Sequence, residues 1–120
     1  MITREEIFKH VKENYGTSPD YPFQKFPNYA ALRHESNKKW YALIMNVLPE
    51  KLGLDGNKEI DVLNLKCPPE ISDSLRNGTN ILSGYHMDKE NWISLVLDRT
   101  DPEGEIYNLI EQSFYLTKKK

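Results

Sequence analysis

The chain has 120 residues, a formal net charge of −2 and a sequence pI of about 5.9. That length fits one domain, residues 1–120, which can bury a core without disulfides or metals. No apolar run approaches the roughly 20 residues that span a bilayer, so we expect no membrane role. The acidic balance gives only weak support to duplex-DNA binding, which usually goes with a basic excess. Cys67 is the single cysteine, which excludes an intramolecular disulfide and, without a secretory signal, favours the cytoplasm.

The first predicted element is a helix that begins after Thr3. Thr3-Arg4-Glu5-Glu6 has the form of a capping box, in which the threonine hydroxyl and the last glutamate each accept a hydrogen bond from the other residue's amide. Ile7, Val11 and Tyr15 recur four residues apart and form one apolar stripe. Gly16 suits the C-cap, so the sequence predicts that the helix ends there.

Three strands are predicted next, at 29–35, 40–48 and 60–67, because these segments are rich in aromatic and β-branched residues. Ser36-Asn37-Lys38 has turn chemistry and predicts a hairpin between the first two. The second strand is apolar on both sides, so alternation leaves its facing open.

A short helix and a hairpin are predicted in the second half of the chain. Pro68-Pro69 ends the third strand and opens the helix, since proline is tolerated in a first turn, and Gly78 stops it. Residues 82–88 and 91–98 have the pattern of two strands around Lys89-Glu90.

Asp101-Pro102 opens the last predicted helix, as its N-cap and first position. Its inner face is expected to carry Ile106, Leu109, Ile110 and Phe114. The resulting order is α-β-β-β-α-β-β-α. Strands joined by short turns predict an α+β fold, a two-layer sandwich in which an antiparallel five-stranded sheet carries helices on one face.

Strand alternation predicts which side chains face the helices. The residues expected in one core are Ile7, Val11, Leu43, Leu63, Leu65, Ile93, Leu95, Ile106, Leu109 and Ile110. Cys67 and Leu97 should point the same way. Trp92, Asn64 and Lys66 should point away from the helices and form an aromatic and polar patch beside a cation.

No catalytic constellation can be named from the sequence. His10, His34 and His86 lack metal-ligand spacing, and no cysteine pair supports them. Cys67 precedes a helix N-terminus, where a dipole can activate a thiol, but a small buried hydrophobe at a strand end is the favoured interpretation. We therefore expect a protein that is not an enzyme, with no catalytic residue, no metal and no cofactor.

Charge is unevenly distributed along the chain. Residues 28–48 carry a net charge of +2, whereas residues 98–111 carry −4. The most unusual segment, 84–92, gathers a histidine, a lysine, an asparagine and two aromatic residues around one turn. Such a cluster suits phosphate binding and base stacking. The alternative is a structural hairpin in which Tyr85 and Trp92 pack across the strands.

Several segments together resemble the MmcQ/YjbR family of small bacterial proteins. The matching segments are Phe23, residues 29–34, 39–45, 63–67, 84–87 with Lys89 and Trp92, and 113–116. The most specific are Asn-Leu-Lys-Cys and Tyr-His-Met-x-Lys-x-x-Trp. The chain departs from the family at Pro68, usually an aspartate, and at Ser83, where proline is common. The resemblance implies a two-layer sandwich like that of type III secretion chaperones, and a cytoplasmic protein described as DNA-binding through a double-wing arrangement.

The leading hypothesis is a non-enzymatic DNA-binding or regulatory module of a bacterial cytoplasm. The residues expected to contact DNA are Arg33, Lys38, Lys39, Lys66, His86 and Lys89, with Trp92 as a stacking surface. The alternative hypothesis is a protein-interaction module that uses the open sheet face and has no nucleic-acid role.

Overall fold

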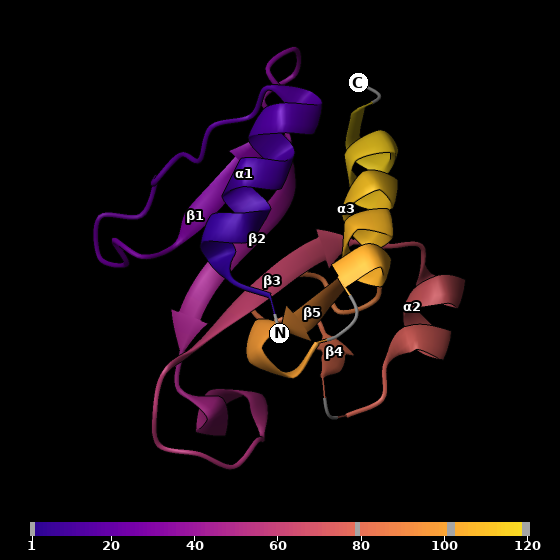
Figure 1. Ribbon diagram of the computed structural model, residues 1–120. Coiled ribbons are helices and arrows are strands. Elements are labelled where there is room, and N and C mark those ends of the chain that lie inside the picture. The colour runs from indigo at the N-terminus through magenta and orange to yellow at the C-terminus, as the bar shows by residue number, and fades with distance from the viewer. Residues whose placement is uncertain (1, 79, 101–102, 119–120) are drawn as a thin grey trace.

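The computed structural model describes residues 2–78, 80–100 and 103–118 (Figure 1). The helices are α1 (Arg4–Tyr15), α2 (Pro69–Leu75) and α3 (Glu103–Lys118), with 3₁₀ turns η1 (Pro49–Leu52) and η2 (Leu97–Arg99). The strands are β1 (Ala30–Arg33), β2 (Trp40–Val47), β3 (Ile60–Lys66), β4 (Ile81–Ser83) and β5 (Trp92–Val96). The predicted order of helices and strands is confirmed.

The strands form one antiparallel sheet in the order β1-β2-β3-β5-β4. Figure 1 shows α1 and α3 over the same face of this sheet, with α2 lying to the side of α3. The rings of Tyr15 in α1 and Phe114 in α3 stack at 4.2 Å between centroids, which joins the two helices directly. The predicted two-layer α+β sandwich with an antiparallel five-stranded sheet is therefore confirmed.

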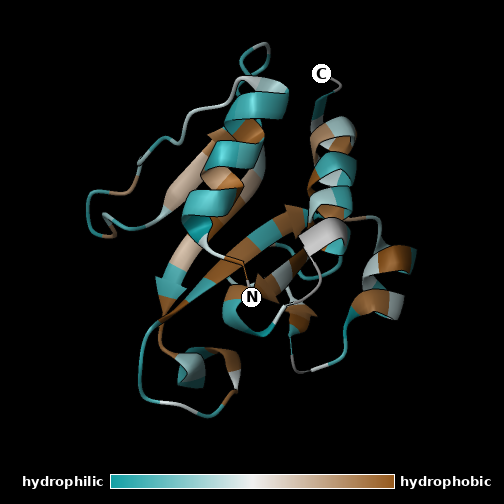
Figure 2. Ribbon diagram, in the orientation of Figure 1, coloured by the Kyte–Doolittle hydropathy of each residue, from teal (hydrophilic) through white to brown (hydrophobic). Residues whose placement is uncertain are grey.

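The face beneath the helices holds the larger hydrophobic core. Ile7 of α1 and Ile106 of α3 are fully buried against inward strand residues such as Leu65 and Leu95. In Figure 2 the strands are largely brown, whereas teal residues mark the outward turns of α1 and α3. The helices are therefore amphipathic and present their apolar faces to the sheet, as the spacing of their apolar residues predicted.

A bulge in β2 decides the facing that alternation left open. Leu32 pairs with Ala42, but the next residue, Arg33, pairs with Trp40. Tyr41 is therefore the extra residue of the bulge. Both Tyr41 and Ala42 belong to the helix-side core, and Trp40 packs on the opposite face.

A second hydrophobic cluster fills the face of the sheet away from the helices, here called the outer face. Its strand residues include Leu43, Met45 and Val62, all buried. The prediction that Leu43 joins the helix-side core is wrong, because the register sets it opposite Asn64, which points outward.

The outer face is covered rather than open. Asn64 is 0% exposed and Trp92 is 9% exposed, although both point away from the helices as predicted. Lys66 is half-buried. The expectation of an exposed aromatic and polar patch here is therefore wrong, and the cause is the loop 84–91.

That loop is longer than the predicted hairpin turn, because β4 ends at Ser83 and β5 begins at Trp92. Asn64 Nδ2 donates to the Tyr85 carbonyl oxygen at 2.8 Å, and the Tyr85 amide donates to Ser94 Oγ at 2.8 Å. These two bonds satisfy buried polar groups and hold the loop over β3 and β5.

The helix ends follow their sequence signals. Thr3 and Glu6 form the predicted capping box at α1, and Gly16 adopts the left-handed conformation (φ 69°) at its C-cap. Pro68 is the N-cap of α2 and provides no side-chain cap, so the departure from the family pattern leaves the N-cap position without a carboxylate. The predicted cap at Asp101-Pro102 lies outside the described residues.

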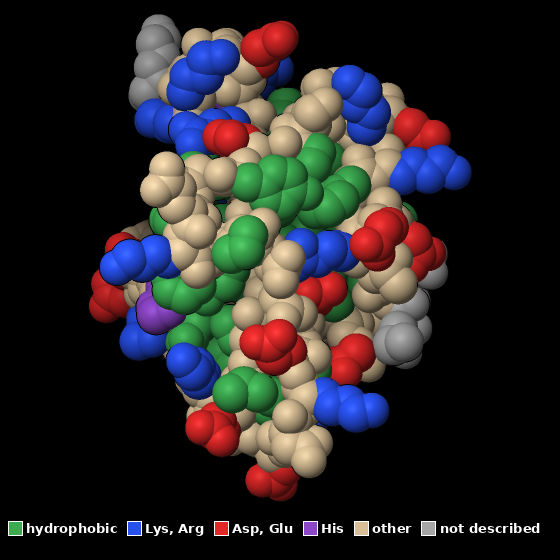
Figure 3. All heavy atoms as spheres, turned by 90° about the vertical axis from the view of Figure 1, so that its left-hand side faces the viewer, with side chains coloured by type: hydrophobic (Ala, Val, Ile, Leu, Met, Phe, Trp, Pro, Cys, Tyr) green, Lys and Arg blue, Asp and Glu red, His purple; other side chains and the backbone are tan. Residues whose placement is uncertain are grey.

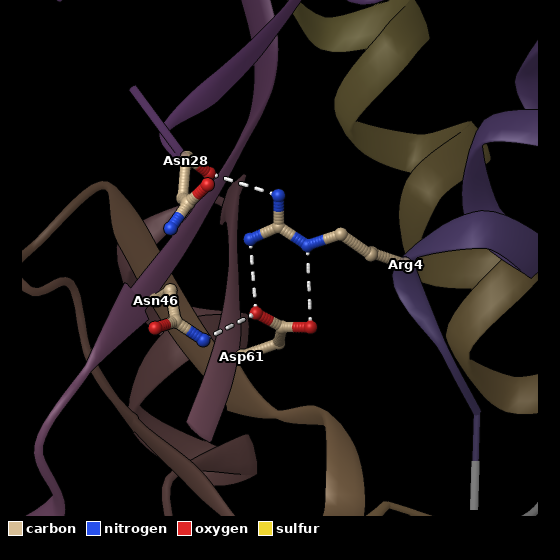
Figure 4. A network of polar contacts seen from close by, with 4 residues as sticks. All are labelled: Arg4, Asn28, Asn46 and Asp61. Carbon is tan, nitrogen blue, oxygen red and sulfur yellow. Dashed lines mark hydrogen bonds and ion pairs between the residues drawn. The ribbon is translucent and has the colours of Figure 1, made fainter. Parts of the chain in front are cut away.

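A polar network ties α1 to the sheet (Figure 4). The Arg4 guanidinium donates to both Asp61 carboxylate oxygens, at 3.2 and 2.9 Å, and to the Asn28 carbonyl oxygen at 2.9 Å. Asn46 Nδ2 donates to the same carboxylate at 3.0 Å. This bidentate pair therefore fixes the first turn of α1 over β2 and β3.

Candidate functional site

The candidate cations converge on one end of the sheet. Because neighbouring strands are antiparallel, the ends of β1 and β3 lie beside the starts of β2 and β5. The cationic end is defined here as Arg33, Lys38, Lys39, Lys66, His86 and Lys89. These residues come from the end of β1, the turn 34–39, the end of β3 and the loop 84–91. The fold thus brings together residues more than 50 positions apart in the sequence.

Arg33 is engaged within the protein. Its Nε lies 2.9 Å from Asp20 Oδ2, and its guanidinium carbon lies 5.7 Å from the centroid of the Trp40 ring. The carboxylate offsets much of its charge, so Arg33 contributes less to an anion-binding surface than the sequence suggested.

Lys38 and Lys39 lie on an exposed turn that is docked onto the end of α3. Asn37 Nδ2 donates to the carbonyl oxygens of Thr117 and Lys118, at 3.1 and 3.0 Å. Lys38 adopts a left-handed conformation with φ 63°. The turn is therefore fixed, and both lysines are exposed.

A cleft of about 630 Å³ lies between this turn and the ends of α1 and α3. Four cations line it, Lys12, Arg33, Lys38 and Lys118, together with the acidic residues Asp20 and Glu35. The local charge is therefore positive, in contrast to the chain as a whole.

Lys66 and Trp92 face one another across β3 and β5. The lysine Nζ lies 6.0 Å from the indole centroid, within reach of a cation–π interaction. Trp92 is too buried to stack on a base, so the stacking surface predicted from the sequence is not available in this structure.

The loop 84–91 presents Lys89 to solvent. Its Nζ lies 3.4 Å from the Gly84 carbonyl oxygen. Hydrogen bonds from the Asn91 side chain and the Glu90 amide hold the pKa of Asp88 below its usual range, and the Lys66 charge acts in the same direction. The charged Asp88 therefore organises the turn.

Gly84 is required at the start of this loop. A Cβ there would lie 2.7 Å from the Trp92 Cβ, closer than real Cβ atoms approach. The Gly84 amide also donates to the Trp92 carbonyl oxygen at 3.0 Å. The loop that carries Lys89 can therefore pack against Trp92 only because Gly84 has no side chain.

Buried hydrogen bonds of two α3 side chains support the cationic end, and they were not predicted from the sequence. Ser113 Oγ of α3 donates to the Tyr41 carbonyl oxygen and accepts from the Lys66 amide, at 2.9 Å for the latter bond. Four residues on, Thr117 Oγ1 lies 2.7 Å from His34 Nε2. The available signal was the helical spacing of Ser113 and Thr117 with the apolar stripe of α3.

Two further hollows are lined by none of the lysines of the cationic end. One, of about 730 Å³, lies between α2 and α3, where Ile71, Tyr115 and Leu116 are exposed. The other, of about 320 Å³, lies on the outer face among aromatic and methionine side chains. Figure 3, viewed from the side of β1, shows hydrophobic side chains reaching the surface among charged ones.

Cys67 is buried in the helix-side core, and burial raises the pKa of its thiol, with Glu70 adding to the effect. This environment opposes thiolate formation. Within 2–78, 80–100 and 103–118, the histidines, cysteines and acidic residues form no group of three that could hold a metal ion.

None of the helices in the described part of the chain has both the length and the apolar character needed to cross a membrane.

The fold defines a small α+β protein whose antiparallel sheet is covered by helices on one face and by loops on the other. The model of the YjbR family matches residues 12–116, and the chain belongs to this family. It is 84% identical over 118 residues to the uncharacterized protein YyaQ of Bacillus subtilis strain 168, covering 98% of this chain and all of that protein.

Solved structures show the same fold. A crystal structure of a Pseudomonas syringae protein superposes with a TM-score of 0.93 at 45% identity, covering 97% of this chain and 99% of that one. The Deinococcus radiodurans protein DR2400 gives a TM-score of 0.77 at 25% identity, covering all of this chain and 81% of its own. The architecture is thus shared by proteins that are 45% and 25% identical to this chain.

Proposed function

We propose that this chain is a non-enzymatic module of the bacterial cytoplasm that binds DNA through its cationic end. The observation that carries the proposal is the convergence of Lys38, Lys66 and Lys89 from three separate segments on one end of the sheet. The chain as a whole has a net charge of −2, whereas this end carries several positive charges. This uneven distribution of charge would orient a polyanion toward the cationic end.

The spacing of these segments suits a duplex. The turn 34–39 and the loop 84–91 flank the sheet end, and β1 and β5 are three strand steps apart. At ~4.8 Å per step, that separation is about 14 Å. A major groove is ~12 Å wide, so the turn, which is docked on α3, and the loop, which folds back over the outer face, are separated on the scale of its two phosphate rows. This arrangement agrees with the double-wing mode that the family resemblance implies.

Contacts within the protein occupy some of these cations, which limits the expected affinity for DNA. Arg33 is paired with Asp20, and Lys66 lies over Trp92 with Asp88 nearby. Only two or three phosphates would be neutralised, so we expect weak, sequence-independent binding with a Kd of roughly 10⁻⁴–10⁻⁶ M at physiological salt.

Fluorescence anisotropy with labelled duplex and single-stranded DNA across a salt series tests this proposal. We expect duplex binding at low salt that weakens as salt rises. We expect no preference for single strands, because Trp92 is buried. Absence of binding to both forms at low salt would reject the proposal, as would tight binding that salt does not change.

A protein-binding role is the second candidate, and the exposed groove between α2 and α3 favours it. Tyr115 and Leu116 are 54% and 44% exposed, and Ile71 lies beside them. The occupant we infer is a second copy of this chain. Glu111 and Lys118 are two helical turns apart on the same side of α3, so an antiparallel α3 pair would set each glutamate against the partner's Lys118.

Sedimentation equilibrium separates this candidate from DNA binding. The chain should dimerise without DNA, Leu116→Asp should abolish the dimer, and Glu111→Lys should weaken it. Adding Lys118→Glu to Glu111→Lys should restore the dimer, because the charge pair is reversed rather than removed. A chain that stays monomeric at millimolar concentration would reject this candidate and leave the DNA proposal unaffected.

A further inference from the structure

A hollow of about 320 Å³ opens on the outer face of the sheet, apart from the lysines of the cationic end. Its floor is Leu43 and Met45 of β2, which are buried in the sheet. Phe23, Phe26 and Met87 line it from the two segments that cross this face. A concave apolar site of this size lies within the range that small molecules occupy.

The aromatic side of the hollow is held in place by its own ring contacts. Phe23 lies edge-on to Trp40 at 5.6 Å and to Tyr29 at 5.9 Å. Phe26 stacks on Tyr29 at 4.6 Å. Because each ring contacts another, the rings keep their positions without a ligand, which lowers the entropic cost of binding.

The opposite side is held by the loop 84–91. Asn64 anchors this loop through the Tyr85 carbonyl, and Met87 follows two residues later. Its thioether is flexible and polarisable, and it suits contact with an aromatic ring. His86 lies at the same side, with a left-handed backbone of φ 62°.

The volume and lining together indicate the ligand. A closed apolar cavity of ~150 Å³ holds one benzene ring, so ~320 Å³ corresponds to about two rings. No acidic or lysine side chain is among the described residues that line the hollow. Phe26 is 49% exposed, so a bound ring would remove apolar surface from water.

We propose that this hollow is a binding site for a small, planar, uncharged two-ring aromatic molecule of the size of indole. A purine base has the same size, but its ring nitrogens and amino group need hydrogen-bond partners. Among the described residues that line the hollow, only Tyr29, Trp40 and His86 carry a side-chain nitrogen or oxygen, so a purine would leave polar groups unpaired. The site is therefore distinct in chemistry from a base-stacking surface, and it does not depend on DNA binding.

The test is a titration of indole into the protein labelled with ¹³C at the methionine methyl groups, followed by NMR. We expect the Met45 and Met87 signals to shift along one saturable curve with one site per chain. Adenine and tryptamine, as a purine and as a cationic indole, should each bind at least tenfold more weakly. Equal or tighter binding of either would overturn the assigned ligand chemistry.

Three variants locate the site. Phe26→Ala should weaken indole binding about 3- to 10-fold, the range expected for one aromatic contact. Met87→Trp should fill the hollow and abolish the Met45 shift, with an unchanged far-ultraviolet circular dichroism spectrum showing that the fold is retained. Tyr115→Ala removes an exposed aromatic residue of the α2–α3 groove and should leave the affinity unchanged.

The results that would reject the indole site differ from those that would reject DNA binding. Indole shifts that do not saturate, or that persist unchanged in Met87→Trp, would reject the site whatever the anisotropy shows. Loss of indole affinity in Tyr115→Ala would place the binding in the α2–α3 groove and would equally overturn the proposal.

Discussion

The two faces of the sheet are built from the same strands but are closed in different ways. The helix face is closed by α1 and α3, whose apolar stripes pack regularly against residues such as Leu63 and Leu95. The outer face is closed by irregular segments, and the loop 84–91 is held there by two hydrogen bonds of Tyr85, whose carbonyl oxygen accepts from Asn64 and whose amide donates to Ser94. The regular face provides stability, whereas the irregular face leaves a hollow and exposed cations.

The largest expected effect compares one substitution on both faces. Leu95→Ala on the helix face should cost about 3–5 kcal/mol of unfolding free energy, because helices on one side and sheet on the other limit collapse into the cavity. Leu43→Ala on the outer face should cost about 2–3 kcal/mol, because Leu43 borders an existing hollow. Urea denaturation measures both. Equal costs would show that the two faces are packed alike.

The second prediction concerns the loop that covers the outer face. Gly84→Ala should destabilise the protein by about 1–3 kcal/mol, because the added Cβ meets Trp92. Its matched control is Gly53→Ala, where nothing lies within 4 Å and only the positive φ of 75° opposes the change, at a cost of about 1 kcal/mol. The near-ultraviolet circular dichroism spectrum of the protein, to which Trp92 contributes, should change in Gly84→Ala alone. An unaltered spectrum in Gly84→Ala would mean that the loop does not pack as described.

A smaller effect is expected at the network that joins the helix layer to the sheet. Asp61→Asn should cost about 1–2 kcal/mol, because the half-buried Arg4 loses its bidentate partner at a site that solvent partly screens. A double-mutant cycle with Arg4→Met isolates the pair. Additive losses would show that Arg4 and Asp61 do not act together.

The smallest expected effect is a pH dependence from the helix face. Burial lowers the pKa of His34 below its ordinary value of 6.5, and the Lys118 charge acts in the same direction, while a backbone hydrogen bond at Phe114 opposes them. As the pH falls below about 6.5, the unfolded chain takes up a proton that the folded chain resists, so stability falls. Burial also lowers the pKa of His10, which adds to the trend.

The melting temperature followed from pH 8 to pH 5 measures this effect. His34→Gln should flatten the curve relative to the wild-type protein, because glutamine keeps a polar group near Thr117 but does not titrate. A curve that His34→Gln leaves unchanged would assign the acid sensitivity to another group.

The sequence predicted the helix face well because its signals are periodic and local. The capping box at Thr3, the stripe of Ile7 and Val11, and the alternation in β3 and β5 each depend on residues a few positions apart. The β2 facing was not predictable, because a one-residue bulge at Tyr41 has no strong composition signal. The cover of the outer face depends on the Asn64–Tyr85 bond, a contact between distant segments that periodicity cannot show.

The candidate site was predicted only in part for the same reason. The residue types at the cationic end could be named from the sequence, but their state could not. The ion pair of Arg33 with Asp20 and the burial of Trp92 both arise from tertiary contacts. The structure therefore leaves the exposed Lys38 and Lys89, with the half-buried Lys66, as the expected phosphate contacts.

The central claim is that one end of the sheet carries the DNA-binding surface, and paired lysine variants test it most directly. Lys66→Ala with Lys89→Ala removes two charges at the cationic end. Lys51→Ala with Lys58→Ala removes two exposed charges from the β2–β3 connection at the opposite end. The measurement is the slope of log affinity for duplex DNA against log salt. The first pair should reduce its magnitude by about 1–2 and the second should leave it unchanged. Equal reductions by both pairs would contradict the claim.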